Sequence, residues 1–547
     1  KSVPDVDPAV VDVAKVREEF QQQASLPSMK RVSGSTAGDS SIASSSSNLR
    51  YSQQFQDNFI EDTDSEDDID SDLETDATKK YNVPKFGGYS NNAKLRASLM
   101  RNSYELFKHL PWTIVDSDKG NGSLKNAVNI AVAEKTVKEP VSWVGTMGIP
   151  TDELPHEVCH KISKKLEQDF SSFPVVTDDI TFKGAYKNYA KQILWPTLHY
   201  QIPDNPNSKA FEDHSWDYYQ KVNQKFSDRI VSVYKPGDTI WIHDYHLMLV
   251  PQMVREKLPK AKIGFFLHVS FPSSEVFRCL ANRERILEGI IGANFVGFQT
   301  KEYKRHFLQT CNRLLAADVS NDEVKYHCNI VSVMYAPIGI DYYHLTSQLR
   351  NGSVLEWRQL IKERWRNKKL IVCRDQFDRI RGLQKKMLAY ERFLIENPEY
   401  IEKVVLIQIC IGKSSDPEYE RQIMVVVDRI NSLSSNISIS QPVVFLHQDL
   451  DFAQYLALNC EADVFLVDAL REGMNLTCHE FIVSSFEKNA PLLLSEFTGS
   501  SSVLKEGAIL INPWDINHVA QSIKRSLEMS PEEKRRRWKK LFKSVIE

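Results

Sequence analysis

The chain has 547 residues, a formal net charge of −3 and a hydrophobic content of 42%. This length and composition are enough for about two to four domains with a large apolar core. The near-neutral charge excludes a globally basic surface for nucleic acid, and no apolar run has the length of a membrane span or the pattern of a signal peptide.

The eight cysteines are scattered along the chain, without a CxxC pair or a His/Cys cluster. This spacing argues against a zinc site and against a disulfide framework, and it suits a reducing cytosol. We therefore expect a cytoplasmic chain without a metal or other cofactor. The first residue is Lys1 rather than Met, so we expect a fragment or a processed chain.

Residues 1–80 differ in composition from the rest of the chain. One part is rich in serine (QQASLPSMKRVSGSTAGDSSIASSSS), and another is an acidic block (EDTDSEDDIDSDLETD). Such segments bury too little apolar area to offset the entropy of ordering, so we expect a disordered regulatory tail. Ser33 lies two residues after a Lys-Arg pair, as in sites of basophilic kinases, and Thr63 and Ser65 lie among acids, as in substrates of acidophilic kinases.

Three short apolar runs, TIWIH, IGFFLH and NFVGF, lie between Asp238 and Thr300. Each has the length and the β-branched or aromatic content of a strand, and the two stretches between them have helical periodicity. This alternation predicts a parallel sheet, and ligands of such sheets bind beyond the carboxyl ends of the strands. The polar residues expected at those ends are His243, Asp244, His268 and Ser270.

Long motifs in these stretches resemble the trehalose-6-phosphate synthase family. They are HDYHLMLVP, GFFLHxxFPSSEVFRCL and ILEGIIGANFVGFQT in the first half of the chain, and VFLVDALREGMNLTCHEFIVSSF in the second. The resemblance implies a retaining glycosyltransferase fold, the α/β GT-B fold of two Rossmann-like lobes with parallel sheets. The expected organisation is a disordered tail at 1–80, an N-terminal acceptor lobe at 81–340, a C-terminal nucleotide-sugar lobe at 341–530, and a helix at 531–547 that crosses back to the first lobe.

The resemblance implies an acceptor-sugar site, with His268 beside the donor sugar. Its expected residues are Tyr186, Trp195, Asp244, His109 and Ser414. Active members have Arg at the positions of His109 and Ser414, and histidine can stay cationic but lacks the bidentate fork of arginine. Ordinary core packing is the alternative for the two aromatic residues, more so for Trp195 than for Tyr186.

The resemblance also implies a nucleotide-sugar site. Its expected residues are Gly122, Ser123, Gln376, Arg381, Glu472, Gly473, Met474, Asn475, Leu476 and Glu480. Active synthases have Arg and Lys at the positions of Gln376 and Arg381. The cation that would stabilise the leaving group is therefore lost at Gln376, and at Arg381 it is a guanidinium instead of an ammonium. Ser123 stands where the family has Gly, and Glu472 where it has Asp. Arg374 shares a strand face with Gln376 and could partly replace the missing charge.

The motifs of the synthase family are thus retained, while their charged residues are altered. We therefore expect the positions of the family's catalytic residues to be vestigial here, at His268, Asp244, Gln376 and Arg381. With the long tail, this pattern resembles the non-catalytic regulatory subunits of the fungal trehalose synthase complex. It implies a regulatory or scaffolding pseudoenzyme and phosphoprotein. The implied partners are the catalytic trehalose-6-phosphate synthase and phosphatase subunits, UDP-glucose or glucose 6-phosphate, and protein kinases that act on the tail, but no nucleic acid and no membrane.

Two alternatives stay open. One is an active enzyme that forms trehalose 6-phosphate from UDP-glucose and glucose 6-phosphate. The other is the N-terminal synthase-like part of a trehalose-phosphate phosphatase whose catalysis lies beyond residue 547. Losing one phosphate-binding cation costs about 2–4 kcal/mol of transition-state stabilisation. Several such losses therefore favour the non-catalytic interpretation.

Overall fold

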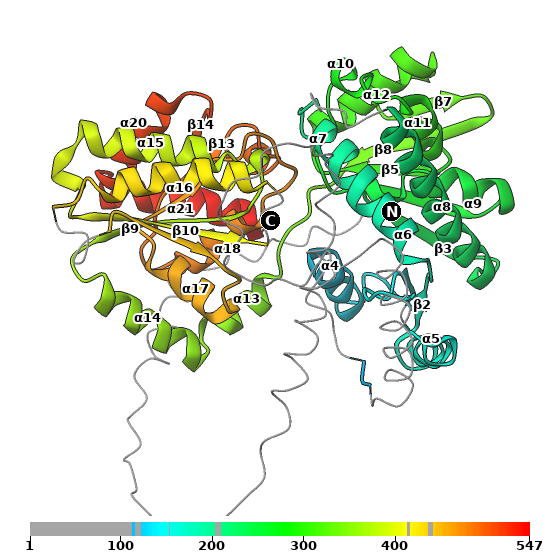
Figure 1. Ribbon diagram of the computed structural model, residues 1–547, viewed down its shortest axis with the longest axis horizontal. Coiled ribbons are helices and arrows are strands. Elements are labelled where there is room, and N and C mark those ends of the chain that lie inside the picture. The colour runs from blue at the N-terminus through cyan, green and yellow to red at the C-terminus, as the bar shows by residue number, and fades with distance from the viewer. Residues whose placement is uncertain are drawn as a thin grey trace, which may run out of the picture. The chain divides into compact units, whose positions relative to one another are not determined.

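The computed structural model describes residues 112–114, 122–152, 154–202, 209–412, 416–435 and 441–546 (Figure 1). Two predicted acceptor residues, His109 and Ser414, lie outside these ranges, as do the predicted tail and its phosphorylation candidates, Ser33, Thr63 and Ser65. Helix α4 begins at Gly122, but the side chain of Ser123 is not described.

Six strands form the first sheet, in the order β3-β4-β5-β8-β7-β6. Their bounds are β3 Thr239–His243, β4 Lys262–Leu267, β5 Phe295–Phe298, β6 Asp318–Val319, β7 Glu323–Tyr326 and β8 Asn329–Tyr335. The strands β3, β4, β5 and β8 are parallel, whereas β7 runs antiparallel to both of its neighbours. The three parallel strands predicted between Asp238 and Thr300 are therefore confirmed.

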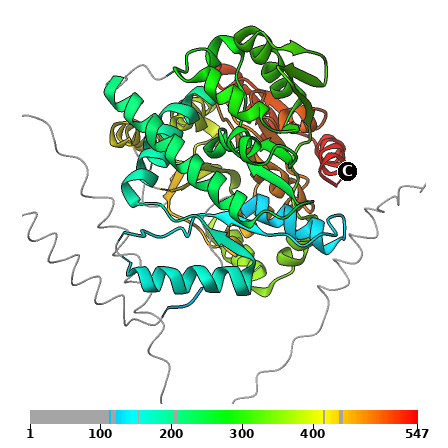
Figure 2. The same ribbon diagram turned by 90° about the vertical axis from the view of Figure 1, so that its right-hand side faces the viewer.

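One face of the first sheet packs on helices, and we call this half of the chain the first lobe (Figure 2, cyan to green). The helices are α8 Lys209–Val233, α9 Val250–Lys257, α10 Ser274–Phe277, α11 Arg283–Ile291 and α12 Lys301–Leu315. Alternate residues of β4, such as Ile263 and Phe265, enter this core because successive side chains of a strand point to opposite faces. On the other face Trp241, Phe295 and Met334 are 58%, 56% and 52% exposed.

Shorter elements precede or border the first sheet. They are α4 Gly122–Ala133, β1 Trp143–Gly145, α5 His156–Phe170, β2 Ser172–Pro174, α6 Asp179–Lys183, the π-helix η2 Gly184–Leu194, α7 Trp195–Leu198 and the 3-10 helix η3 Tyr245–Leu247. Strands β1 and β2 form a separate parallel pair. The π-helix η2 continues directly from α6 and leads into α7, and such wide turns are often found at functional sites.

The second sheet is wholly parallel, with the order β11-β10-β9-β12-β13-β14. Its strands are β9 Lys369–Gln376, β10 Val404–Ile411, β11 Val443–His447, β12 Val464–Val467, β13 Leu492–Ser495 and β14 Ile509–Ile511. The chain adds β10 and β11 on one side of β9, and β12 to β14 on the other. The strand order therefore reverses between β9 and β12, and ligands of open parallel sheets bind beyond the carboxyl ends at such a point.

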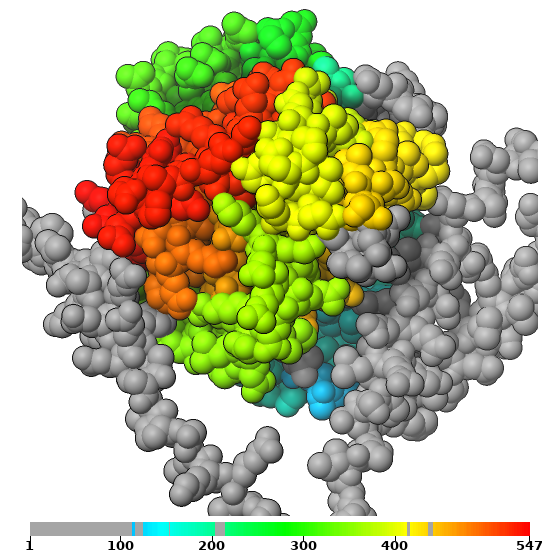
Figure 3. Space-filling view, turned by 90° about the vertical axis from the view of Figure 1, so that its left-hand side faces the viewer, coloured from blue at the N-terminus to red at the C-terminus, as the bar shows by residue number. Residues whose placement is uncertain are grey.

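Helices cover both faces of the second sheet, and this half is the second lobe. They are α13 Tyr342–Leu349, α14 Gly352–Arg364, η4 Arg379–Arg381, α15 Leu383–Glu396, η5 Pro398–Tyr400, α16 Pro417–Asn431, α17 Phe452–Glu461, α18 Leu476–Ser484, α19 Ser501–Leu504, α20 Ile516–Leu527 and α21 Pro531–Ile546. Leu370 and Val372 of β9 join the core under α13, α14, α17, α18 and α21, and Ile371 and Cys373 join the core under α15, α16 and α20 (Figure 1). Figure 3 shows segments of α13–α14 (yellow-green), α15–α16 (yellow) and α20–α21 (red) at the surface of this lobe.

The C-terminal helix α21 packs on α18 and α19. The Nε1 of Trp538 donates to the carbonyl of Ile482 at 2.8 Å, and the ring of Phe542 lies edge-on to Tyr342. These contacts belong to the second lobe, so the crossing back to the first lobe stays a prediction. All eight cysteines are free thiols. Among the described helices, none combines the length and the apolar character needed to cross a bilayer.

Candidate functional site

Asp244 follows β3 in a backbone conformation that is rare for any residue except glycine. Its φ is 71° and its ψ is 170°, a region that costs about 1–3 kcal/mol. The carboxylate accepts a hydrogen bond from the backbone N–H of His268 at 3.3 Å. Burial raises the pKa of Asp244 to about 6. Strain held at the carboxyl end of a strand is a feature of binding sites, and the structure puts it at a predicted acceptor residue.

His268 directly follows β4 and lies beside a second histidine. The Nε2 of His268 lies 3.1 Å from the Nδ1 of His243, so one ring donates to the other. Burial lowers the pKa of His268 to about 4, and burial together with the neighbouring ring lowers the pKa of His243 to about 3. Both imidazoles are therefore neutral at pH 7. His268 can offer a hydrogen bond to a ligand, but it supplies no positive charge.

Lys191 joins the predicted acceptor residues, and sequence reasoning missed it. Its Nζ lies 4.5 Å from the ring centroid of Trp195, 5.7 Å from that of Tyr186 and 5.8 Å from that of Tyr245. Burial lowers the pKa of Lys191, although the Asp244 carboxylate opposes that shift. Three aromatic rings around one ammonium make a cation–π site. The spacing of four residues between this lysine and a tryptophan was a signal, but the contact with Tyr186 depends on the π-helix.

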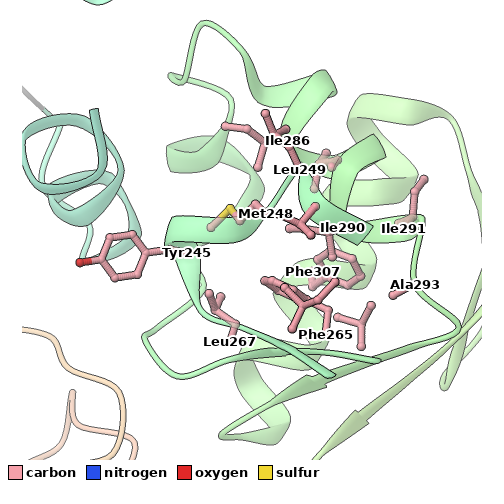
Figure 4. Close-up of a cluster of buried hydrophobic side chains, with 14 of the residues drawn as sticks. Tyr245, Met248, Leu249, Phe265, Leu267, Ile286, Ile290, Ile291, Ala293 and Phe307 are labelled. Carbon is pink, nitrogen blue, oxygen red and sulfur yellow. The ribbon is translucent and has the colours of Figure 1, made fainter. Parts of the chain in front are cut away.

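Two buried polar atoms near this ammonium have no hydrogen-bond partner among the described residues. They are the hydroxyl of Tyr245 and the Nε2 of His246. Figure 4 shows the ring of Tyr245 at the edge of an apolar cluster, with its hydroxyl directed away from the other labelled side chains. Buried polar groups are normally hydrogen-bonded, so these atoms are suited to a polar ligand.

Hydrogen bonds join the first lobe to the second lobe. The Nε1 of Trp195 donates to Oδ2 of Asp378 at 2.9 Å, and the hydroxyl of Tyr303 donates to the carbonyl of Glu472 at 2.7 Å. Gly473 lies against the first lobe as well, because a Cβ added there would be 2.5 Å from the carbonyl oxygen of His268. Trp195 therefore has a structural role in addition to its predicted binding role.

A pocket opens where the two lobes meet, at the carboxyl ends of β9 and β12. Its lining residues are His268, Gln299, Ile338, Arg374, Asp375, Gln376, Arg381, Ile411, Glu472, Met474, Asn475, Leu476, Thr477 and Glu480. The pocket thus brings together most of the predicted nucleotide-sugar residues, with His268. It lies at the point where the order of the second sheet reverses, as expected for a ligand site in a parallel sheet.

The charged side chains of the pocket are held by neighbouring side chains. Arg381 forms an ion pair with Glu472, whose other carboxylate oxygen accepts from the Nδ2 of Asn475 at 2.9 Å. Arg374 lies 4.5 Å from the ring centroid of Tyr455. The Tyr455 hydroxyl donates to Glu480 at 2.8 Å, and burial raises the pKa of Glu480. Gln376 is exposed at the end of β9.

A second charged cluster lies behind the pocket wall. The buried Nζ of Lys386 donates to Oδ2 of Asp375 at 2.5 Å and to Oε1 of Gln408 at 3.3 Å. Both carboxylate oxygens of Asp468 are buried without a hydrogen-bond partner in the described part of the chain, and burial raises the pKa of Asp468 to about 7. The Lys386 ion pair thus links the end of β9, which carries the pocket residues 374–376, to α15.

The comparisons with known proteins agree with this architecture. The model of glycosyltransferase family 20 matches residues 84–547. The trehalose synthase complex regulatory subunit TSL1 of Saccharomyces cerevisiae is 64% identical over 542 residues, which are 95% of this chain and 49% of that protein. The chain spans about half the length of the first curated relatives that it matches.

Two solved structures are similar over most of the chain. The N-terminal domain of Candida albicans trehalose-6-phosphate phosphatase has a TM-score of 0.71 and 39% identity, and the match covers 80% of this chain and 91% of that one. A UDP-forming trehalose-phosphate synthase of Burkholderia xenovorans has a TM-score of 0.67 and 25% identity, with 76% and 92% covered. The predicted α/β GT-B fold is confirmed, and the chain belongs to glycosyltransferase family 20.

Proposed function

We propose that this chain is part of a regulatory or scaffolding subunit of a trehalose synthase complex, which acts in trehalose biosynthesis without synthase activity of its own. The main support for this proposal is the 64% identity with the S. cerevisiae regulatory subunit over 95% of the chain. The proposed partners are catalytic trehalose-6-phosphate synthase and phosphatase subunits in the cytoplasm. Protein kinases would act on Ser33, Thr63 and Ser65, outside the described residues.

The charges of the pocket support the absence of synthase activity. A glycosyl transfer from a nucleotide sugar needs a positioned cation for the leaving diphosphate. At the end of β9, Gln376 supplies no charge, and the guanidinium of Arg374 lies over the ring of Tyr455. Arg381 is paired with Glu472. The neutral His268 adds none. The pocket gathers most of the predicted nucleotide-sugar residues, but its charges do not favour that reaction.

Reconstitution tests the proposal. The chain, within its full-length protein, is mixed with purified catalytic synthase and phosphatase subunits, and UDP release from UDP-glucose and glucose 6-phosphate is measured for each component and for the mixture. We expect co-elution in gel filtration, no UDP release by this protein alone, and a changed rate in the mixture. Turnover by this protein alone, at a rate similar to that of the catalytic subunit, would refute the proposal.

A second candidate is the synthase-like part of a trehalose-phosphate phosphatase, which the likeness to the C. albicans phosphatase domain favours. Phosphate release from trehalose 6-phosphate by the full-length protein distinguishes the two candidates. The regulatory proposal predicts no release without the phosphatase subunit, whereas the second candidate predicts release by the protein alone.

A further inference from the structure

The pocket between the lobes contains an ion pair that the sequence motifs did not indicate. Arg381, at the end of η4, pairs with Glu472 from the loop before α18. The two side chains are 13% and 11% exposed, so the pair is largely removed from water. Burial alone would lower the pKa of Arg381, but the Glu472 carboxylate raises it. In the structure, therefore, one amino group of this guanidinium is committed to a partner within the chain, whereas its buried Nε has no hydrogen-bond partner among the described residues.

The carboxylate of Glu472 is fixed in place from its other side. Asn475 donates its Nδ2 to the second carboxylate oxygen, and its own Oδ1 caps α18 by accepting from the backbone N–H of Cys478 at 3.2 Å. Glu472 therefore bridges the cap of α18 and Arg381. An aspartate at this position would be one methylene shorter and could not span both contacts from the same backbone.

The surroundings of Arg381 add more negative charge. The Asp375 and Asp378 carboxylates both act on its guanidinium, in addition to Glu472. Among the charged side chains that line the pocket, Arg374 and Arg381 are two cations, whereas Asp375, Glu472 and Glu480 are three carboxyl groups. Of these three carboxyl groups, Asp375 pairs with Lys386, which lies behind the wall. These described side chains give the pocket no excess of positive charge for an anionic ligand.

We propose that the Arg381–Glu472 ion pair determines the ligand class of this pocket: it withholds the guanidinium from a diphosphate, so the pocket discriminates against nucleoside diphosphates and accepts an uncharged nucleoside or sugar. This inference rests on the proposed function, because it concerns the same altered synthase-like site. A diphosphate that takes the paired amino group would have to displace Glu472 from Arg381 and leave a buried carboxylate without its cation, which is costly.

The test compares UDP with uridine, since the two ligands differ only by the diphosphate. Each is titrated calorimetrically into the full-length protein and into the Glu472→Gln variant, which keeps the size of the side chain but removes its charge. We expect the wild-type protein to bind UDP no more tightly than uridine. In Glu472→Gln the freed guanidinium should tighten UDP binding by about 10- to 100-fold and change uridine binding by less than about 3-fold.

Two further variants make the result specific. Glu472→Asp shortens the side chain and is also expected to tighten UDP binding. It replaces Glu472→Gln in the test if the glutamine variant does not fold. Glu461→Gln is the matched control, because Glu461 forms a buried ion pair with Arg358 outside the pocket. The ratio of UDP to uridine affinity should not change in this control.

Several outcomes would overturn the inference. The wild-type protein could bind UDP 10-fold or more tightly than uridine. A folded Glu472→Gln variant could show no gain in UDP affinity relative to uridine affinity. The Glu461→Gln control could show the same gain in UDP affinity as Glu472→Gln. Because the readout is binding, the result is separate from the proposed function. Synthase turnover by the wild-type protein would refute the regulatory role, whereas an unresponsive Glu472→Gln variant would refute only the role of the ion pair.

Discussion

Replacing Asp244 with asparagine should change how the stability of the protein depends on pH. Burial raises the pKa of Asp244 to about 6 in the folded protein, against 3.8 for an unperturbed aspartate. The folded state therefore holds a proton between these pH values that the unfolded state has released. It follows that this group makes the wild-type protein less stable as pH rises from about 4 to 6. A difference of about two pKa units corresponds to about 3 kcal/mol.

The variant Asp244→Asn lacks this titration but keeps an oxygen that can accept from the backbone of His268. Asparagine also tolerates a positive φ better than most residues. The free energy of unfolding is measured by urea denaturation from pH 4 to pH 7.5 for both proteins. The stability of the variant relative to the wild type should increase by about 3 kcal/mol across this range.

The pH dependence isolates the titration from any constant effect of the substitution. A variant that is weaker at every pH by the same amount would give parallel curves, and parallel curves would refute the raised pKa. Asp318→Asn, at an exposed position on β6, is the matched control and should give a curve parallel to that of the wild type.

Three further substitutions test contacts of the site. Trp195→Phe removes the hydrogen bond to Asp378 and should lower the stability by about 1 kcal/mol, measured as a shift of the urea midpoint. Gly473→Ala puts a Cβ 2.5 Å from a carbonyl oxygen of the first lobe and should cost about 1–3 kcal/mol, whereas Gly339→Ala meets no atom within 4 Å and should cost far less. Lys386→Met leaves a buried carboxylate without its cation and should cost about 3–5 kcal/mol, measured by calorimetry.

Each of these expectations has a contrary result. An unchanged urea midpoint for Trp195→Phe would show that its hydrogen bond between the lobes adds no stability. Equal losses for the two glycine variants would mean that the close approach at Gly473 is relieved without cost. A Lys386→Met variant as stable as the wild type would mean that the paired Asp375 becomes protonated or is reached by water.

The sequence by itself determined the class of the fold and the main strands. The runs TIWIH, IGFFLH and NFVGF became β3, β4 and β5, because their length and their β-branched and aromatic content suit strands of a parallel sheet. The long motifs indicated the GT-B fold, and they also selected residues that the structure gathers in one pocket. Local patterns were enough for these conclusions because strand periodicity and motif spacing are properties of neighbouring residues.

Only the tertiary structure decided how the charges of the site are used. The motifs described Arg381 and Glu472 as two separate substitutions, 91 residues apart, and gave no sign that they form an ion pair. Lys191 contacts Tyr186 because a π-helix, rather than an α-helix, turns it toward that ring, and it contacts Tyr245 through tertiary packing. The strained backbone and the raised pKa of Asp244 depend on burial between β3, β4 and η3. Pairing, burial and strain arise between segments that are distant in the sequence, so the three-dimensional packing alone fixes them.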